Sequence, residues 1–84
     1  MSKIYLEVQA PGNARTYEFS ADNAMTVGKV KKQFIGQISA VENRDIFSKD
    51  EGVLFCSKQL GGLLQDQEIL GEVGVKSGDT IILL

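Results

Sequence analysis

Few residues of this chain could perform covalent chemistry. Cys56 is the single cysteine, and the sequence contains no histidine that could act as its base. We therefore interpret Cys56 as an inert strand residue and expect Cys56→Ser to leave function intact. The sequence shows no cluster of metal-ligand residues, and the acidic pairs Asp50-Glu51 and Asp66 with Glu68 lack the spacing of a calcium loop. We interpret these acidic residues as solubilising, and the sequence predicts a non-enzymatic protein that binds no cofactor and no metal.

Two glycine-containing motifs bear on function. Val27-Gly28-Lys29 contains the Gly-Lys pair of a phosphate-binding loop, but Val30 stands where a serine or threonine would ligate magnesium, and Asn23 stands where the upstream glycine belongs. Gly61-Gly62 is the only diglycine. In sulfur carriers and conjugated modifiers this pair is C-terminal, whereas here more of the chain follows it. We expect a turn at Gly61-Gly62 and no nucleotide site at Gly28.

Charge and composition argue against nucleic acid and membrane as partners. The formal net charge of -2 argues against nucleic acid as the main partner, and the longest apolar run is too short for membrane insertion. Lys29, Lys31 and Lys32 form one basic cluster, which is either a solvated helix face or a docking site for an acidic partner. The N-terminus lacks the apolar core of a signal peptide, and one cysteine cannot form an internal disulfide, so we expect a cytoplasmic protein.

The N-terminal half predicts a hairpin followed by a helix. Strict alternation predicts a strand over Lys3–Ala10, the residues Pro11-Gly12-Asn13 predict a turn, and a second strand is expected from about Arg15 to Ser20. The period then changes to about 3.6, with Thr26 as the expected N-cap of a helix. The expected buried stripe of this helix is Val27, Val30, Phe34, Ile38 and Val41, and Gly28 and Gly36 each weaken it by up to about 1 kcal/mol. A polar loop is expected from Glu42 to Gly52.

The C-terminal half predicts short strands joined by turns. A third strand is expected over Val53–Ser57 and a very short fourth strand at Leu63-Leu64. The segment from Gln65 to Gly78 is rich in turn residues, and Ser77-Gly78-Asp79 leads into a final strand over Thr80–Leu84. Three residues of the turn-rich segment are expected to anchor it to the core, namely Leu70, Val73 and Val75.

The order of these elements resembles that of ubiquitin-like β-grasp domains. Val53-Leu54-Phe55-Cys56-Ser57-Lys58-Gln59-Leu60 resembles their third-strand segment, and Val75-Lys76-Ser77-Gly78-Asp79-Thr80-Ile81 resembles the turn into their last strand. The resemblance implies an α+β fold in which a mixed sheet of four to five strands is crossed by one helix, with the final strand parallel to the first. It covers residues 1–84, which we expect to form a single ubiquitin-like domain.

Among prokaryotic proteins, the chain resembles the YukD/EsaB family, small cytosolic ubiquitin-like proteins encoded with type VII secretion systems. The likeness is carried by Gly78-Asp79 and by the apolar residues from Ile81 to Leu84, with no Gly-Gly tail. It implies a non-enzymatic adaptor or regulatory protein, with a secretion-system component as its possible partner. A sulfur carrier or conjugated modifier is the alternative, and it would need a C-terminal extension that the given sequence lacks.

The expected binding site lies on the sheet face opposite the helix. If Ile4, Leu6, Val53, Phe55, Ile81 and Leu83 point at the helix, alternation sends other apolar side chains to the opposite face. Single exposed apolar residues are commonplace, but neighbouring ones commonly mark an interaction site, and in ubiquitin-like domains this face usually binds partners. We predict one contiguous protein-binding patch centred on Leu54, with Lys58 at its rim. The same face could instead bury against a second copy of the chain. The predicted protein-binding residues are Tyr5, Leu54, Lys58, Ile82 and Leu84.

Overall fold

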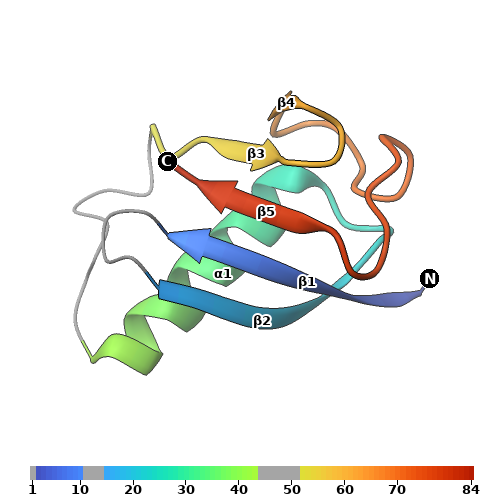
Figure 1. The fold of residues 1–84 in the computed structure, drawn as a ribbon. Helices are drawn as coiled ribbons and strands as arrows, with labels where there is room; N and C mark the ends of the chain where they lie inside the picture. The colour runs from blue at the N-terminus through green and yellow to red at the C-terminus, as the bar shows by residue number, and fades with distance from the viewer. Residues whose placement is uncertain (1, 11–14, 44–51) are drawn as a thin grey trace.

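The computed structural model of the chain describes residues 2–10, 15–43 and 52–84, and these contain one helix and five strands (Figure 1). The turn predicted at Pro11-Gly12-Asn13, the pair Asp50-Glu51 and most of the loop expected from Glu42 to Gly52 lie outside the described residues. The elements are β1 (Lys3–Ala10), β2 (Arg15–Asp22), α1 (Val27–Glu42), β3 (Phe55–Ser57), β4 (Gly62–Leu64) and β5 (Thr80–Leu83).

The strands form one mixed sheet in the order β2-β1-β5-β3-β4. β5 runs parallel to β1, while the β1–β2, β3–β4 and β3–β5 pairs are antiparallel. Figure 1 shows α1 crossing one face of this sheet, and the helix supplies the crossover that a parallel pair requires. The predicted α+β fold and the parallel pairing of first and last strands are confirmed.

The end of β2 and the start of β3 each differ by two residues from the prediction. β2 continues to Asp22 rather than stopping at Ser20, because β1 pairs with it along its full length from Lys3 to Ala10. β3 starts only at Phe55. Leu54 nevertheless follows the strand path, since its backbone N–H donates to the carbonyl of Leu84 at 3.4 Å and its own carbonyl accepts from Leu84 N–H at 3.0 Å.

Thr26 caps α1 as predicted, with its Oγ1 accepting a hydrogen bond from the backbone N–H of Lys29. Val27, Val30, Phe34 and Ile38 are buried as expected, and Ile35, which the predicted stripe omits, is also buried. The prediction for Val41 is wrong, because this side chain is 59 % exposed. Its helical phase is right, but the buried stripe ends at Ile38, and the last turn of the helix finds no described core residue to cover.

The C-terminal end of α1 is fastened to β2 by polar contacts. The Arg15 guanidinium and the Tyr17 hydroxyl each donate to Oε2 of Glu42 at 2.7 Å. The hydrogen bond and the negative charge of Glu42 both raise the pKa of Arg15 above its ordinary value. Because Arg15 is exposed and always charged at physiological pH, this pair positions the helix end more than it stabilises the fold.

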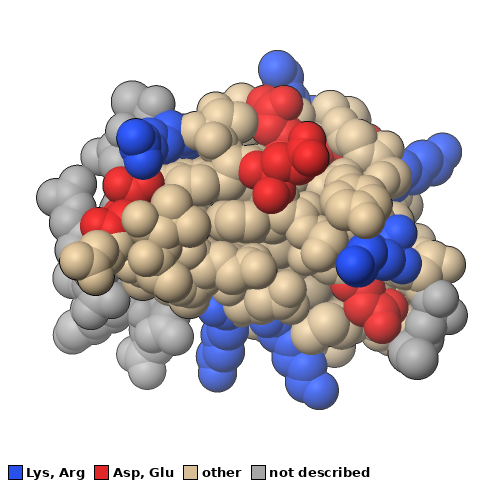
Figure 2. Space-filling model, turned by 90° about the horizontal axis from the view of Figure 1, so that it is seen from below, with Lys and Arg blue, Asp and Glu red and all other residues tan. Residues whose placement is uncertain are grey.

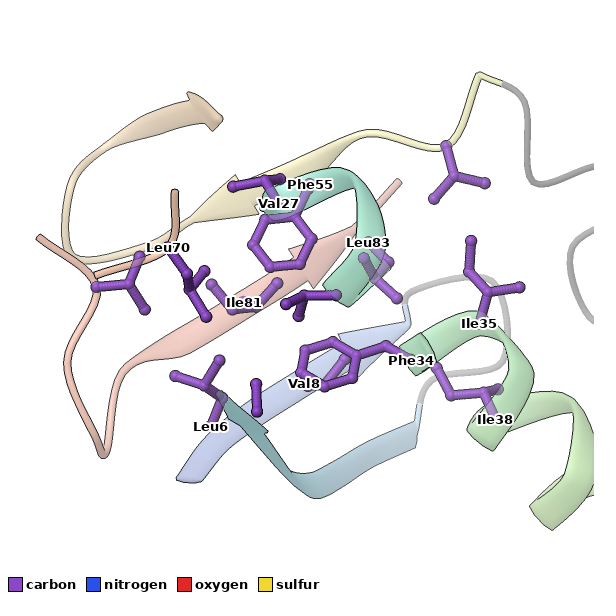
Figure 3. Close-up of a cluster of buried hydrophobic side chains, with 14 of the residues drawn as sticks. Leu6, Val8, Val27, Phe34, Ile35, Ile38, Phe55, Leu70, Ile81 and Leu83 are labelled. Carbon is purple, nitrogen blue, oxygen red and sulfur yellow. The ribbon is translucent and has the colours of Figure 1, made fainter. Parts of the chain in front are cut away.

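The core lies between α1 and the sheet (Figure 3). Phe34 projects from the helix into its centre, with its ring centroid 5.3 Å from that of Phe19 and 6.2 Å from that of Phe55. Alternate residues of β1 and β5 complete this layer, as the alternation predicts. Of the three expected anchors in the turn-rich segment, Leu70 and Val75 are buried, and Val73 is partly buried against the core.

The turn between β3 and β4 and the turn before β5 each contain a glycine with a positive φ angle. Gly61 has φ +77° in the turn between β3 and β4, which confirms the predicted turn at this residue, whereas Gly62, the other half of the predicted turn, is the first residue of β4. Gly78 has φ +93° before β5, and its N–H donates to the carbonyl of Tyr5 at 2.7 Å. Glycine adopts such angles at no steric cost. The second turn therefore sets the register in which β5 meets β1.

The two helix glycines should respond oppositely to alanine. A Cβ at Gly36 would meet nothing within 4 Å, so Gly36→Ala should raise the free energy of unfolding by about 0.5–1 kcal/mol. A Cβ at Gly28 would lie 3.2 Å from the backbone carbonyl oxygen of Asp66, which accepts the Gly28 N–H. Gly28→Ala should therefore destabilise the protein, by about 1 kcal/mol. Urea unfolding of both variants tests this packing, and a gain for Gly28→Ala would contradict it.

Candidate functional site

The sheet face opposite α1, which we call the open face, is organised in rows of paired residues. Residues paired across neighbouring strands point to the same face. Gln9 of β1 pairs with Ile82 of β5, Ile82 pairs with Cys56 of β3, and Cys56 pairs with Leu63 of β4. One row thus crosses four strands and carries three apolar side chains side by side.

A second row lies next to the first and adds two leucines. Leu54 and Leu84 are joined by two backbone hydrogen bonds and stand two positions from Cys56 and Ile82 respectively, so they point to the same face. Leu54, Leu63 and Leu84 are 44 %, 52 % and 57 % exposed. We call the five apolar residues of these two rows the open-face cluster: Leu54, Cys56, Leu63, Ile82 and Leu84.

The structure brings together three of the predicted binding residues, Leu54, Ile82 and Leu84, but places the centre differently. Ile82 has apolar neighbours on its own row and Leu84 on the next, whereas Leu54 lies at the outer row of the cluster. Lys58 is exposed, and its N–H donates to the carbonyl of Thr80, which puts it one row from Ile82. This places Lys58 at the edge of the cluster, and its contribution to binding stays a prediction.

Tyr5 lies on the open face but apart from the cluster. It is 52 % exposed and pairs with Ser20, four positions along β1 from Gln9, the residue that pairs with Ile82. The row between them carries Glu7 and Glu18. The contiguous patch predicted from alternation is therefore interrupted, because alternation assigns a face to each residue but not its position along the strand.

Sequence reasoning missed Leu63 and the acidic row. Leu63 was recognisable only as part of a short strand, and its place beside Cys56 depends on the pairing of β3 with β4. Figure 2, which views the molecule from the β2 side, shows one group of acidic side chains in the upper middle of that surface, further acidic side chains at its left and lower right, and basic side chains around its edge. The open face thus combines an apolar region with an acidic one.

Cys56 occupies the middle of the cluster row, between Ile82 and Leu63. Its side chain is partly exposed and unpaired with any other thiol. The row contributes no basic group beside it that would activate the sulfur as a nucleophile. Cys56 is thus a member of the open-face cluster, and it is the single cysteine of the chain.

The basic cluster predicted on the helix is divided by the structure. Nζ of Lys31 donates to Asp66 Oδ1 at 2.8 Å and to the carbonyl of Val53 at 3.0 Å, and its side chain is only 12 % exposed. Lys31 thus joins α1 to the segments before β3 and after β4. Asp66 is the ion-pair partner of Lys31, so the interpretation of Asp66 as a merely solubilising residue is incomplete. Lys29 and Lys32 remain exposed.

A hollow of about 430 Å³ beside these lysines does not form a phosphate cradle. The first helical N–H groups already have acceptors: Val27 donates to the carbonyl of Glu68, Gly28 to that of Asp66, and Lys29 to the Thr26 side chain. A phosphate-binding helix start needs these donors free. The geometry agrees with the expectation that Gly28-Lys29 is no nucleotide site.

In residues 2–10, 15–43 and 52–84, no three His, Cys, Asp or Glu side chains converge as a metal site would require. Over the same ranges, no helix has the length and apolar content needed to cross a membrane.

Solved structures share this fold. A ubiquitin-like protein from Trypanosoma brucei aligns with a TM-score of 0.70 at 28% identity, over 100% of this chain and 96% of that one. Caldiarchaeum subterraneum ubiquitin aligns with a TM-score of 0.71 at 22% identity, over 98% and 91% of the two chains. A ubiquitin-like domain from Arabidopsis thaliana gives 0.72 at 22% identity, over 100% and 78%. The chain matches no protein-family model and no curated protein sequence. These likenesses establish a ubiquitin-like fold.

Proposed function

We propose that this protein is a non-enzymatic ubiquitin-like adaptor or regulator that binds a protein partner through its open face. The observation that carries the proposal is the open-face cluster, in which apolar side chains from β3, β4 and β5 stand next to one another and three leucines are about half exposed. Such contiguous exposure in a folded protein commonly marks an interaction site. The ubiquitin-like fold supports the same class of function.

The shape of the surface beside the open-face cluster also supports binding. Leu54 and Leu63 both line a hollow of about 320 Å³ that continues toward Lys31 and Asp66. An apolar side chain of a partner could enter this hollow while neighbouring residues cover Ile82. Interfaces draw most of their energy from a few such apolar anchors in desolvated pockets.

We propose a type VII secretion system as the setting and the cytoplasm as the location. The first rests on the likeness of Gly78-Asp79 and the following apolar strand to the YukD/EsaB proteins, and the second on the single cysteine of the chain. Inspection of the neighbouring genes tests the setting. A locus without secretion genes would remove the support for it and leave the binding proposal standing.

Site-specific photo-crosslinking in the native cell tests the binding proposal. We expect a photoreactive phenylalanine analogue at Leu63 to form one dominant protein adduct, because Leu63 is an exposed member of the cluster. The matched control places the same analogue at Lys32, an exposed residue of α1 on the other side of the molecule. Equal adducts from both positions, or adducts from Lys32 alone, would refute the open face as the binding surface.

Covalent modification of Cys56 should block the open face. N-ethylmaleimide reacts with thiols, and Cys56 is the single, partly exposed cysteine in the middle of the cluster row. We expect the modified protein to lose the crosslink from Leu63, because the added group stands between Ile82 and Leu63. The Cys56→Ser variant should keep the crosslink and be insensitive to the reagent. Loss of the crosslink in untreated Cys56→Ser would show that the thiol itself is required.

A further inference from the structure

The acidic row of the open face has an unusual pairing. Glu7 of β1 and Glu18 of β2 are directly opposite each other, and both are exposed. The backbone N–H of Glu7 donates to Asp79, on the side away from β2. Glu7 and Glu18 therefore form a non-hydrogen-bonded pair, the kind in which the side chains of an antiparallel ladder come closest. Like charges in this arrangement destabilise the pair.

No described cation neutralises these two carboxylates. The ion pairs formed within residues 2–10, 15–43 and 52–84 are Arg15–Glu42 and Lys31–Asp66. Glu7 accepts one hydrogen bond from the neutral amide of Gln9 at 3.3 Å. Lys58 shares the row but stands two strands away from Glu7, beyond Thr80. The open face thus presents a concentrated negative charge that the described part of the domain leaves uncompensated.

This charge lies between the two apolar parts of the open face. On one side is the row of Ile82 and Cys56, and on the other is Tyr5. A partner that spans both parts must cross the acidic row. Charges buried in an interface are costly unless they are paired, so the partner must supply positive charge at this point.

We infer that the protein partner carries an arginine or lysine that pairs with Glu7 and Glu18, flanked by apolar side chains that cover the open-face cluster. This inference rests on the proposed function and adds the chemistry of the partner. Arginine suits the site well, because its planar guanidinium can donate to two carboxylates at once.

A segment of another protein fits this face better than a second copy of the chain. The exposed apolar area of the cluster is on the order of a few hundred Å², whereas a stable complex of two folded proteins buries about 800 Å² on each partner. A second copy would also bring its own acidic row to the same interface. A short segment with one cation and two or three apolar residues matches both the size and the charge.

A selection of random 16-residue peptides displayed on phage, with the folded protein as bait, tests this inference. We expect the selected peptides to be enriched in arginine or lysine beside aliphatic or aromatic residues. Their affinity should fall at least tenfold for Glu18→Lys and stay within twofold for Glu72→Lys. Glu72 is the matched control, since it is exposed, undergoes the same change of charge and lies in the turn-rich segment outside the open face. Glu18→Lys should also keep or raise the melting temperature, because it removes the like-charge opposition.

The other outcomes separate the inference from the function on which it rests. Peptides that lose binding with Leu54→Arg, but lack basic residues or bind Glu18→Lys as well as wild type, would overturn the inferred cation and leave the binding face intact. A selection that yields no peptide dependent on Leu54 would overturn both. Sedimentation of the free protein as a dimer that Leu54→Arg converts to a monomer would assign the face to a second copy, and the inference would fail.

Discussion

Phe34→Ala is expected to lower the free energy of unfolding by about 3–5 kcal/mol. The side chain is fully buried and touches the aromatic rings of Phe19 and Phe55, so truncation leaves a cavity between α1 and the sheet that neither ring can fill without moving. A domain of this length has roughly 4–13 kcal/mol of stability in total. The variant should therefore be largely unfolded, or melt far below the wild type, in a thermal scan followed by circular dichroism.

Val41→Ala is the control for this prediction. Val41 was expected on the same helical stripe, but it is mostly exposed, so its truncation should change stability by no more than about 0.5 kcal/mol. Phe34 and Val41 lie two turns apart on the same side of the helix, yet their truncations should differ by several kcal/mol. A loss under about 1 kcal/mol for Phe34→Ala would show that the described packing of α1 on the sheet is incorrect.

Leu54→Arg is expected to weaken partner binding at least 30-fold while leaving the fold intact. The side chain is 44 % exposed and lines the hollow next to Leu63, so an arginine places a charge where the partner must bury an apolar group. Loss of an apolar anchor residue costs about 2 kcal/mol or more in an interface. Binding can be measured by calorimetry with the protein captured by the Leu63 crosslink.

The melting temperature of Leu54→Arg tests whether the fold stays intact. We expect it within about 4 °C of the wild type, since the new side chain can extend into water. Lys58→Ala, at the rim of the cluster, should weaken binding by no more than about 1 kcal/mol and serves as the neighbouring control. Unfolding of Leu54→Arg would mean that Leu54 contributes to the core and that the open face is not the binding surface.

The sequence was sufficient for the elements and for the two faces of the sheet. Alternation in β1 and β5 and the helical period through Val27, Val30, Phe34 and Ile38 depend on local geometry alone, so each could be assigned without knowing what packs against it. The end of the buried stripe at Ile38, before Val41, could not be assigned in this way, because it depends on which core residues lie under the last turn of the helix.

The arrangement of the candidate site along the strands was beyond the sequence. Tyr5 and Ile82 were assigned to the same face, but their separation follows from the register in which Gln9 meets Ile82, and that register joins residues far apart in the chain. The same pairing placed Glu7 between them and put Leu63 beside Cys56. No local pattern encodes such a distance, whereas the identity of a face is encoded in every second residue.

The position of β5 in the sheet has a consequence for biosynthesis. β5 is the last described strand of the chain, yet it lies in the middle of the sheet and is the strand that joins β2-β1 to β3-β4. Val8 cannot pair with Ile81, its partner in the parallel β1–β5 pair, until the ribosome has added the intervening residues. At the usual rate of translation this takes roughly 4–15 s. Throughout that time the edge of β1 that later pairs with β5 is open, so the nascent chain, more than the finished protein, is the form that needs protection from aggregation.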